Sequence, residues 1–151
     1  MTRVNVINVY ELSDQHLIAE YRELPRCVKQ NISIVNAPSL YCLGKGHMKF
    51  CRCHILFLLD RYNKICEELL YRGFKISYMA QDLIQWAKDN INNYHILKNY
   101  VPRDEDIALN KNRLIEKYRL KPNFYKWTKR EKPDYYTILW SYFFVDSLIV
   151  Q

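Results

Sequence analysis

Glycine and proline are scarce in this chain of 151 residues, which has three Gly and five Pro. Because these residues supply most tight turns, their scarcity argues against a turn-rich all-β fold and favours long regular elements. The longest apolar stretch, Tyr135 to Val150, is short for a membrane span and contains Asp146. The first ten residues mix polar and apolar types and lack the apolar region of a signal peptide. We therefore expect no membrane partner.

The cysteine count is five, an odd number that does not suggest a disulfide framework. Together with the missing signal region, it predicts an intracellular protein with reduced thiols, in the cytoplasm or nucleus of the host cell. His47, Cys51 and His54 are spaced to share one helix face, with Cys53 and Cys66 near. This is a weak zinc signal, since the CxxC spacing of common zinc sites is absent, and we expect no metal.

The charge balance is basic, with 23 Lys and Arg against 16 Asp and Glu, a formal net charge of +7. Such an excess is compatible with a polyanionic partner, although it also serves solubility. Aromatic residues make up 15% of the chain and include 13 Tyr. Aromatic rings stack on bases, so the composition favours a nucleic-acid partner without deciding for it.

Helical spacing of apolar residues predicts a single compact all-α domain of three main helices with long irregular connections. The first helix starts near Gln15, capped by Ser13 or Asp14, and Pro25 predicts a kink beside Glu23. The second expected helix spans 48–71 and ends at Gly73, and the third spans 105–120 between two prolines. Residues 31–41 have the pattern of a loop, and 82–98 are ambiguous, with a short helix favoured.

Thr2 is small, so Met1 is a good candidate for removal, which would expose the α-amine of Thr2. An α-amine has a pKa of about 7.7–8.0, so roughly a tenth of it is neutral near pH 7, far more than of a lysine. Arg3, Arg22 and Arg26 would lower that pKa further if they lie near it. A neutral amine is the nucleophile that a lyase needs to form an imine with a sugar.

Two segments at the start of the chain, 1–5 and 14–26, closely resemble the pyrimidine-dimer DNA glycosylase family of the phage endonuclease V type. The second reads DQHLIAEYRELPR. Weaker similarities follow in the family's order: LGKGH at 43–47, YRGFKI at 71–76, YVP at 100–102, Arg113-Leu114 with Glu116-Lys117, and PNFYK at 122–126. The resemblance covers most of the chain up to about Trp127. We therefore divide the chain into a glycosylase-like domain, 1–128, and a charged, then aromatic extension, 129–151, for which the family offers no counterpart.

The resemblance implies a DNA repair enzyme, an N-glycosylase and abasic-site lyase that acts on cyclobutane pyrimidine dimers in duplex DNA. The expected partner is double-stranded DNA with UV photoproducts, bound by a monomer without metal or cofactor. In the family the Thr2 amine is the nucleophile and the residue matching Glu23 is the essential acid. Flipping a base opposite the lesion exposes the damaged sugar.

The first helix carries most of the expected site. Arg22 and Arg26 are spaced i, i+4, so one face presents two guanidinium groups suited to phosphate oxygens. Arg3 is expected to make a further phosphate or sugar contact, and His16, two turns before Glu23, to line the cleft. Glu20 is expected on the same surface but with much less effect on activity.

A second group of DNA contacts is expected near the carboxyl end of the domain. Arg113 and Lys117 are again spaced i, i+4 and match the family's second phosphate-gripping site. Phe124, Tyr125 and Lys126 match its aromatic and basic segment. Half or more of that aromatic cluster is expected to be core packing.

Two alternatives stay open at this point. The protein could be an abasic-site lyase without dimer specificity, or a non-catalytic DNA-binding protein that retains the scaffold. The pair Thr2 and Glu23 discriminates, because a protein that only binds DNA needs neither an amine nucleophile nor its acid.

Overall fold

The computed structural model describes residues 4–136, and every secondary-structure element within them is helical. The α-helices are α1 (Asp14–Lys29), α2 (His47–Arg52), α3 (Ile55–Tyr71), α4 (Ala80–Asn90) and α5 (Asp104–Leu120). Two short 3-10 turns, η1 (Val9–Glu11) and η2 (Tyr94–Ile96), lie in the connections. This confirms the predicted all-α fold.

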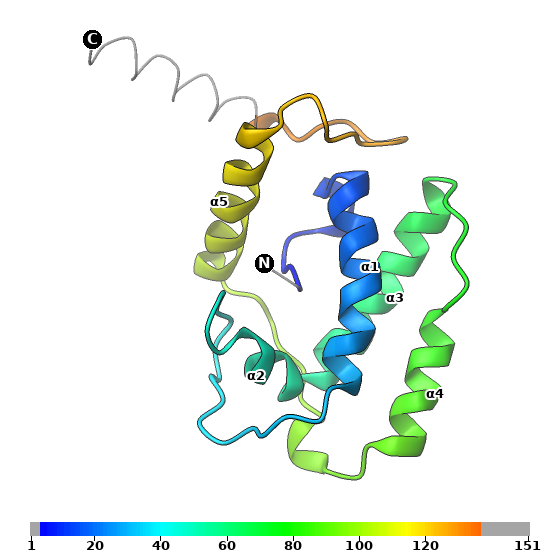
Figure 1. Cartoon of the computed structure of the whole chain (residues 1–151), viewed down its shortest axis with the longest axis vertical. Helices are drawn as coiled ribbons and strands as arrows, with labels where there is room; N and C mark the ends of the chain where they lie inside the picture. The colour runs from blue at the N-terminus through cyan, green and yellow to red at the C-terminus, as the bar shows by residue number, and fades with distance from the viewer. Residues whose placement is uncertain (1–3, 137–151) are drawn as a thin grey trace, which may run out of the picture.

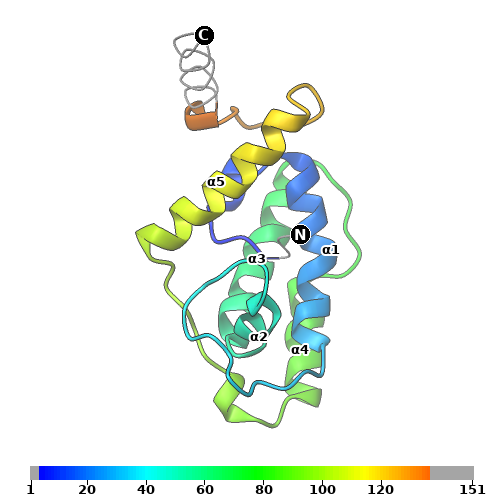
Figure 2. The same cartoon turned by 60° about the vertical axis from the view of Figure 1, so that its left-hand side comes forward.

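Helices α1, α3 and α4 run side by side, and α2 packs against α1 and α3 beside the lower end of α1 in Figure 1. Helix α5 stands on the other side of α1, and the segment before α1 runs through the space between them (Figures 1 and 2). The core consists of aliphatic and aromatic side chains from all of these parts, with Leu17, Leu24, Leu58 and Leu114 among the fully buried ones.

Helix α1 begins and ends close to the predicted positions. The Ser13 hydroxyl accepts the N–H of His16, which satisfies a donor that a helix start leaves open and contributes about 1 kcal/mol. The helix continues through Pro25 to Lys29, although Pro25 has no N–H to give to Tyr21. The helical spacing of Leu17, Tyr21, Leu24 and Val28 predicts that they face the core. Leu17, Leu24 and Val28 are buried, and Tyr21 is partly buried against the core.

The second predicted helix, 48–71, is instead two helices that break at Cys53 and His54. The His54 Nδ1 lies 2.7 Å from the Phe50 carbonyl, the oxygen that the His54 backbone N–H would reach in a continuous helix. The first N–H groups of α3 are satisfied from elsewhere, since Leu56 and Phe57 both donate to the Lys98 carbonyl. The break thus coincides with a side chain that occupies a backbone acceptor of the helix.

Two glycines define the ends of these helices. Gly46 precedes α2 with φ +93°, and a Cβ there would lie 3.0 Å from Pro38 Cγ, so both conformation and space favour glycine. Gly73 follows α3 with φ +92°, as the predicted stop at this position requires. The ambiguous stretch 82–98 contains most of α4, whose Asp82 carboxylate accepts the Met79 N–H at 2.7 Å, and then η2.

The described start of the extension, residues 129–136, packs against the domain. Tyr136 is buried, with its ring centroid 4.5 Å from that of Tyr118 on α5. Arg130 donates two hydrogen bonds to the buried Glu68 carboxylate. The boundary at residue 128 stays a prediction. Within residues 4–136, no helix combines the length and the apolar character that a membrane span requires.

Candidate DNA-binding and catalytic site

Three of the predicted site residues on α1, Arg22, Glu23 and Arg26, lie within about one turn of each other. Arg22 and Arg26 are exposed, whereas Glu23 is mostly covered, with 22% of its side chain accessible. The Arg26 guanidinium is 3.5 Å from the Glu23 carboxylate, an i, i+3 pair on the helix surface. A carboxylate thus lies beside exposed cations, an arrangement that suits a backbone of phosphates and a cationic intermediate.

Glu20, expected on the same surface, is buried, and that expectation was wrong. Its side chain is 1% accessible and forms a bidentate pair with Arg61 of α3. It also accepts a hydrogen bond from Asn5 Nδ2 at 2.7 Å. The buried carboxylate of Glu20 is tolerated because its charge is paired with that of Arg61. Glu20 therefore joins elements in the interior, whereas Glu23, one turn later, pairs with Arg26 on the helix surface.

Thr2 and Arg3, the predicted nucleophile and its neighbour, lie outside the described residues. The chain is defined from Val4 on, and its next residues are held by side chains from several helices. Asn110 of α5 accepts the N–H groups of Val6 and Ile7 at 2.7 and 3.3 Å. Arg61 donates to the Ile7 carbonyl at 2.7 Å. The segment between α1 and α5 is therefore fixed although it has little regular structure.

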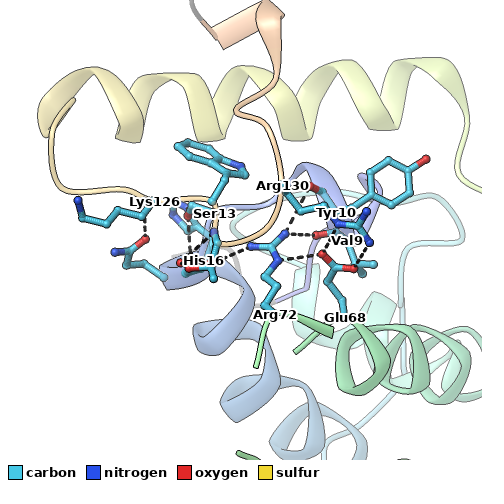
Figure 3. Close-up of polar contacts among 12 residues, drawn as sticks. Val9, Tyr10, Ser13, His16, Glu68, Arg72, Lys126 and Arg130 are labelled. Carbon is cyan, nitrogen blue, oxygen red and sulfur yellow. Dashed lines mark hydrogen bonds and ion pairs between the residues drawn. The ribbon is translucent and has the colours of Figure 1, made fainter. Parts of the chain in front are cut away.

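His16 is built into a second cluster, where α1 begins and α5 ends (Figure 3). Its Nδ1 lies 3.1 Å from the Ser13 hydroxyl and 3.0 Å from that of Tyr118, and its ring stacks on Tyr125 at 4.9 Å. Burial, helped by the positive charge of Lys117, lowers the pKa of His16 to about 4. At neutral pH His16 is therefore uncharged, and contributes shape and hydrogen bonding rather than charge.

Lys117 is partly buried near His16, whereas Arg113, one turn earlier, is exposed. Burial lowers the pKa of Lys117, and the nearby Arg113 charge lowers it further. The structure thus brings the second predicted basic pair to the same end of the molecule as His16.

The backbone of segment 124–126 forms hydrogen bonds with the start of α1, two with the Gln15 side chain and one with the backbone of Asp14. The Gln15 side chain donates to the Phe124 carbonyl and accepts the Lys126 N–H, at 3.0 and 3.1 Å, and the Lys126 carbonyl accepts the N–H of Asp14 at 2.7 Å (Figure 3). Tyr125 is half-buried against His16. Phe124, 53% exposed, and Lys126, also exposed, remain accessible to DNA.

A buried charge network supports this end of the molecule. Arg72, at the end of α3, donates to the carboxylates of Glu68 and Asp14 and to the carbonyls of Val9 and Tyr10 (Figure 3). Burial alone would raise the pKa of Glu68, but hydrogen bonds from Arg130 and Arg72 outweigh it and hold that pKa below its usual value. The network fixes the start of α1 relative to α3.

The weak zinc signal in α2 has another explanation in the structure. His47 Nδ1 lies 2.7 Å from the Cys42 carbonyl, and its Nε2 accepts the N–H of Val4 at 3.2 Å. Cys51 is fully buried with its Sγ 3.7 Å from the same Nε2. Within the described part of the chain, no group of three or more His, Cys, Asp or Glu side chains is arranged to hold a metal ion.

Several of these contacts had no signal in the sequence. The roles of Arg61, Asn110 and His47 depend on pairing residues more than forty positions apart. A cavity of about 860 Å³ between the N-terminal segment, α3 and the loop before α5 is lined by none of the predicted site residues. The candidate site is instead an open surface along α1 and the end of α5, as a long substrate such as duplex DNA requires.

In a comparison with protein-family models, residues 1–82 match the pyrimidine dimer DNA glycosylase family. The matched range is more than half of the chain and contains His16, Arg22, Glu23 and Arg26. Helix α5 and the segment 124–126 follow it. The chain therefore belongs to the pyrimidine dimer DNA glycosylase family, whose members act on UV-damaged DNA.

Proposed function

We propose that this DNA repair glycosylase also cleaves the strand, and that it does both through an imine formed by the α-amine of Thr2 after Met1 is removed. Glu23 supplies the carboxylate that the reaction needs. The enzyme acts as a monomer on cyclobutane pyrimidine dimers in duplex DNA, without metal or cofactor. Two observations support the proposal: the match to the pyrimidine dimer DNA glycosylase family, and the contact of the N-terminal segment with α1.

The observation that carries it is the hydrogen bond between Asn5 Nδ2 and Glu20 Oε1, 2.7 Å long. It holds the chain start against α1 one turn before Glu23. Thr2 is three residues before Asn5, so their Cα atoms are no more than about 11 Å apart. One helical turn rises about 5.4 Å, so these spans are compatible with an amine and a Glu23 carboxylate that face the same sugar, as the proposal requires.

The reaction then proceeds in four steps. The neutral amine attacks C1′ of the 5′ sugar of the dimer, and the glycosidic electron pair leaves with the base. Loss of a proton and opening of the sugar ring give the imine between C1′ and the nitrogen of Thr2. A base removes a C2′ proton, and the electrons expel the 3′ phosphate by β-elimination. Water finally hydrolyses the imine and releases the enzyme.

Glu23 suits two of these steps. A negative charge beside C1′ stabilises the cationic sugar and the protonated imine, and a carboxylate within reach of C2′ can take the proton. Arg22 and Arg26 on the same face hold the flanking phosphates. Arg3, His16, Arg113, Lys117, Phe124, Tyr125 and Lys126 extend the DNA contact to both sides.

The test is reductive trapping with borohydride on two duplexes, one with a thymine dimer and one with an abasic site. We expect a covalent adduct with both duplexes, and mass spectrometry should map it to residue 2. The rate of adduct formation should be the same with and without EDTA. An adduct with the abasic duplex alone would indicate a lyase without dimer specificity. If protein with a verified Thr2 amino terminus gives no adduct, both enzymatic hypotheses are wrong, and a non-catalytic DNA-binding protein is the alternative that is left.

A protein that retains Met1 provides the matched control. Its amine is displaced by one residue, about 3.8 Å, and Thr2 becomes an amide that cannot form the imine. We expect this form to bind the dimer duplex and give no adduct at residue 2.

A further inference from the structure

The backbone N–H and the backbone carbonyl of Val4, which belong to adjacent peptide groups, are both held by side chains. Its N–H donates to His47 Nε2 at 3.2 Å, and its carbonyl accepts the Tyr41 hydroxyl at 2.8 Å. The Val4 side chain is fully buried. Val4 is the first of the described residues and lies two positions after Thr2 in the sequence.

His47 and Tyr41 are themselves anchored. The Cys42 carbonyl can only accept a hydrogen bond, so His47 Nδ1, 2.7 Å away, carries the proton and Nε2 is left to accept from Val4. The Tyr41 ring lies edge-on to those of His47 and Phe50, and its backbone N–H donates to the Tyr100 hydroxyl at 3.0 Å. Both groups are buried, so both donate or accept from defined positions.

The direction of the chain at Val4 decides where the amine of Thr2 points. Only two peptide units separate the two residues, about 7 Å of chain. Contacts farther along, from Glu20, Asn110 and Arg61, hold residues 5 to 7, whereas His47 and Tyr41 hold the backbone of Val4 itself. A misplacement of about 1 Å at a reacting atom can cost about a hundredfold in rate.

We propose that His47 and Tyr41 are positioning residues. By holding the backbone N–H and the backbone carbonyl of Val4, they direct the Thr2 amine towards C1′. The inference rests on the proposed function of Thr2. Neither residue touches the DNA in this scheme, so their loss should reduce the rate of imine formation at saturating DNA and leave the Kd for DNA unchanged.

The experiment compares the variants His47→Asn, His47→Gln and Tyr41→Phe in single-turnover trapping on abasic duplex. Asn ends near the position of Nδ1 and cannot reach Val4, whereas Gln can carry its amide oxygen out towards the position of Nε2. We expect a rate loss of tenfold or more for His47→Asn and Tyr41→Phe, partial recovery for His47→Gln, and Kd values within twofold of wild type.

Two matched controls make the same chemical changes on the exposed surface: His95→Asn and Tyr94→Phe. Both should trap at the wild-type rate. Circular dichroism and Tm establish folding, and if His47→Asn does not fold, Tyr41→Phe, which keeps its ring, carries the test.

The outcomes separate this inference from the function on which it rests. Wild-type trapping at residue 2 together with normal rates for folded His47→Asn and Tyr41→Phe would overturn the inference alone. Equal losses of rate and DNA binding would also overturn it, since they indicate general disruption. No adduct at residue 2 in the wild type would overturn the proposed function first, and the positioning role with it.

Discussion

The Glu20 carboxylate of α1 is paired with the Arg61 guanidinium of α3 in the interior, where the two side chains are 1% and 7% accessible. Arg61 also donates to the Ile7 carbonyl, and Glu20 accepts from Asn5. The pair thus joins two helices to the chain start. Removing one partner of a buried pair leaves an uncompensated charge, which is far more costly than losing a surface pair.

Glu20→Gln is therefore expected to lower the free energy of unfolding by about 3 kcal/mol or more. Arg61 would keep a charge without its counter-ion in the interior. Urea unfolding at pH 7 measures the change, and Lys64→Gln, which removes a cation from an exposed i, i+4 pair with Asp60, is the control with an expected change below about 0.5 kcal/mol. Equal stability of wild type and Glu20→Gln would show that the pair contributes nothing.

Glu23→Gln is expected to behave in the opposite way. Its side chain is 22% accessible and pairs with the exposed Arg26, so stability should change by less than about 1 kcal/mol, whereas strand cleavage should fall by a hundredfold or more. Single-turnover cleavage of the dimer duplex, beside a Kd for the same duplex, separates chemistry from binding. Cleavage at the wild-type rate would remove Glu23 from the mechanism.

His16 predicts a pH dependence of stability. Its folded pKa of about 4 is below the unfolded value of 6.5, so the unfolded state takes up a proton first as the pH falls. Stability associated with His16 is therefore fully present above pH 6.5 and is lost between 6.5 and about 4, roughly 2 kcal/mol by pH 5. Urea unfolding of wild type and His16→Phe at pH 7 and pH 5 measures it, since only the wild type should show this loss.

DNA binding should weaken as salt is added, because phosphate contacts release counterions. Arg22→Ala and Arg26→Ala should each reduce the slope of log K against log salt by about 0.9. The control is Lys64→Ala, an equal loss of charge at an exposed position on α3. An equal reduction in all three would indicate a nonspecific effect of net charge, and the α1 face would not be the contact surface.

Arg72 and Arg130 both bind Glu68, but their burial predicts unequal effects. The Arg72 side chain is fully buried, so Arg72→Ala should cost about 3–5 kcal/mol and separate the start of α1 from α3. Arg130 is one-third exposed, and Arg130→Ala leaves Glu68 paired with Arg72. We expect a clearly smaller loss in Tm for Arg130→Ala, and a loss as large as that of Arg72→Ala would contradict this order.

Local signals predicted the parts of the fold that depend on neighbouring residues. Ser13 and the spacing of Leu17, Leu24 and Val28 define α1, and Gly73 ends α3. The break before α3 escaped prediction, because the capture of a backbone carbonyl by His54 follows from geometry rather than from a pattern.

The predicted site likewise has a part that local spacing predicts and a part that depends on distant residues. Arg22, Glu23 and Arg26 share a surface because of their helical spacing, which the sequence displays. The burial of Glu20 depends on Arg61, 41 positions away, and no local signal pairs them. The fixed course of the chain start depends likewise on distant side chains, Asn110 above all.

The buried course of residues 4–7 also bears on biosynthesis. An aminopeptidase must draw the first residues of its substrate into its own active site, but from Val4 on this chain is covered and bonded to α1, α2, α3 and α5. Freeing it would mean breaking those contacts. If Thr2 is the nucleophile, Met1 is therefore best removed while the chain is still emerging from the ribosome, and a polypeptide that folds first would be trapped as an inactive form.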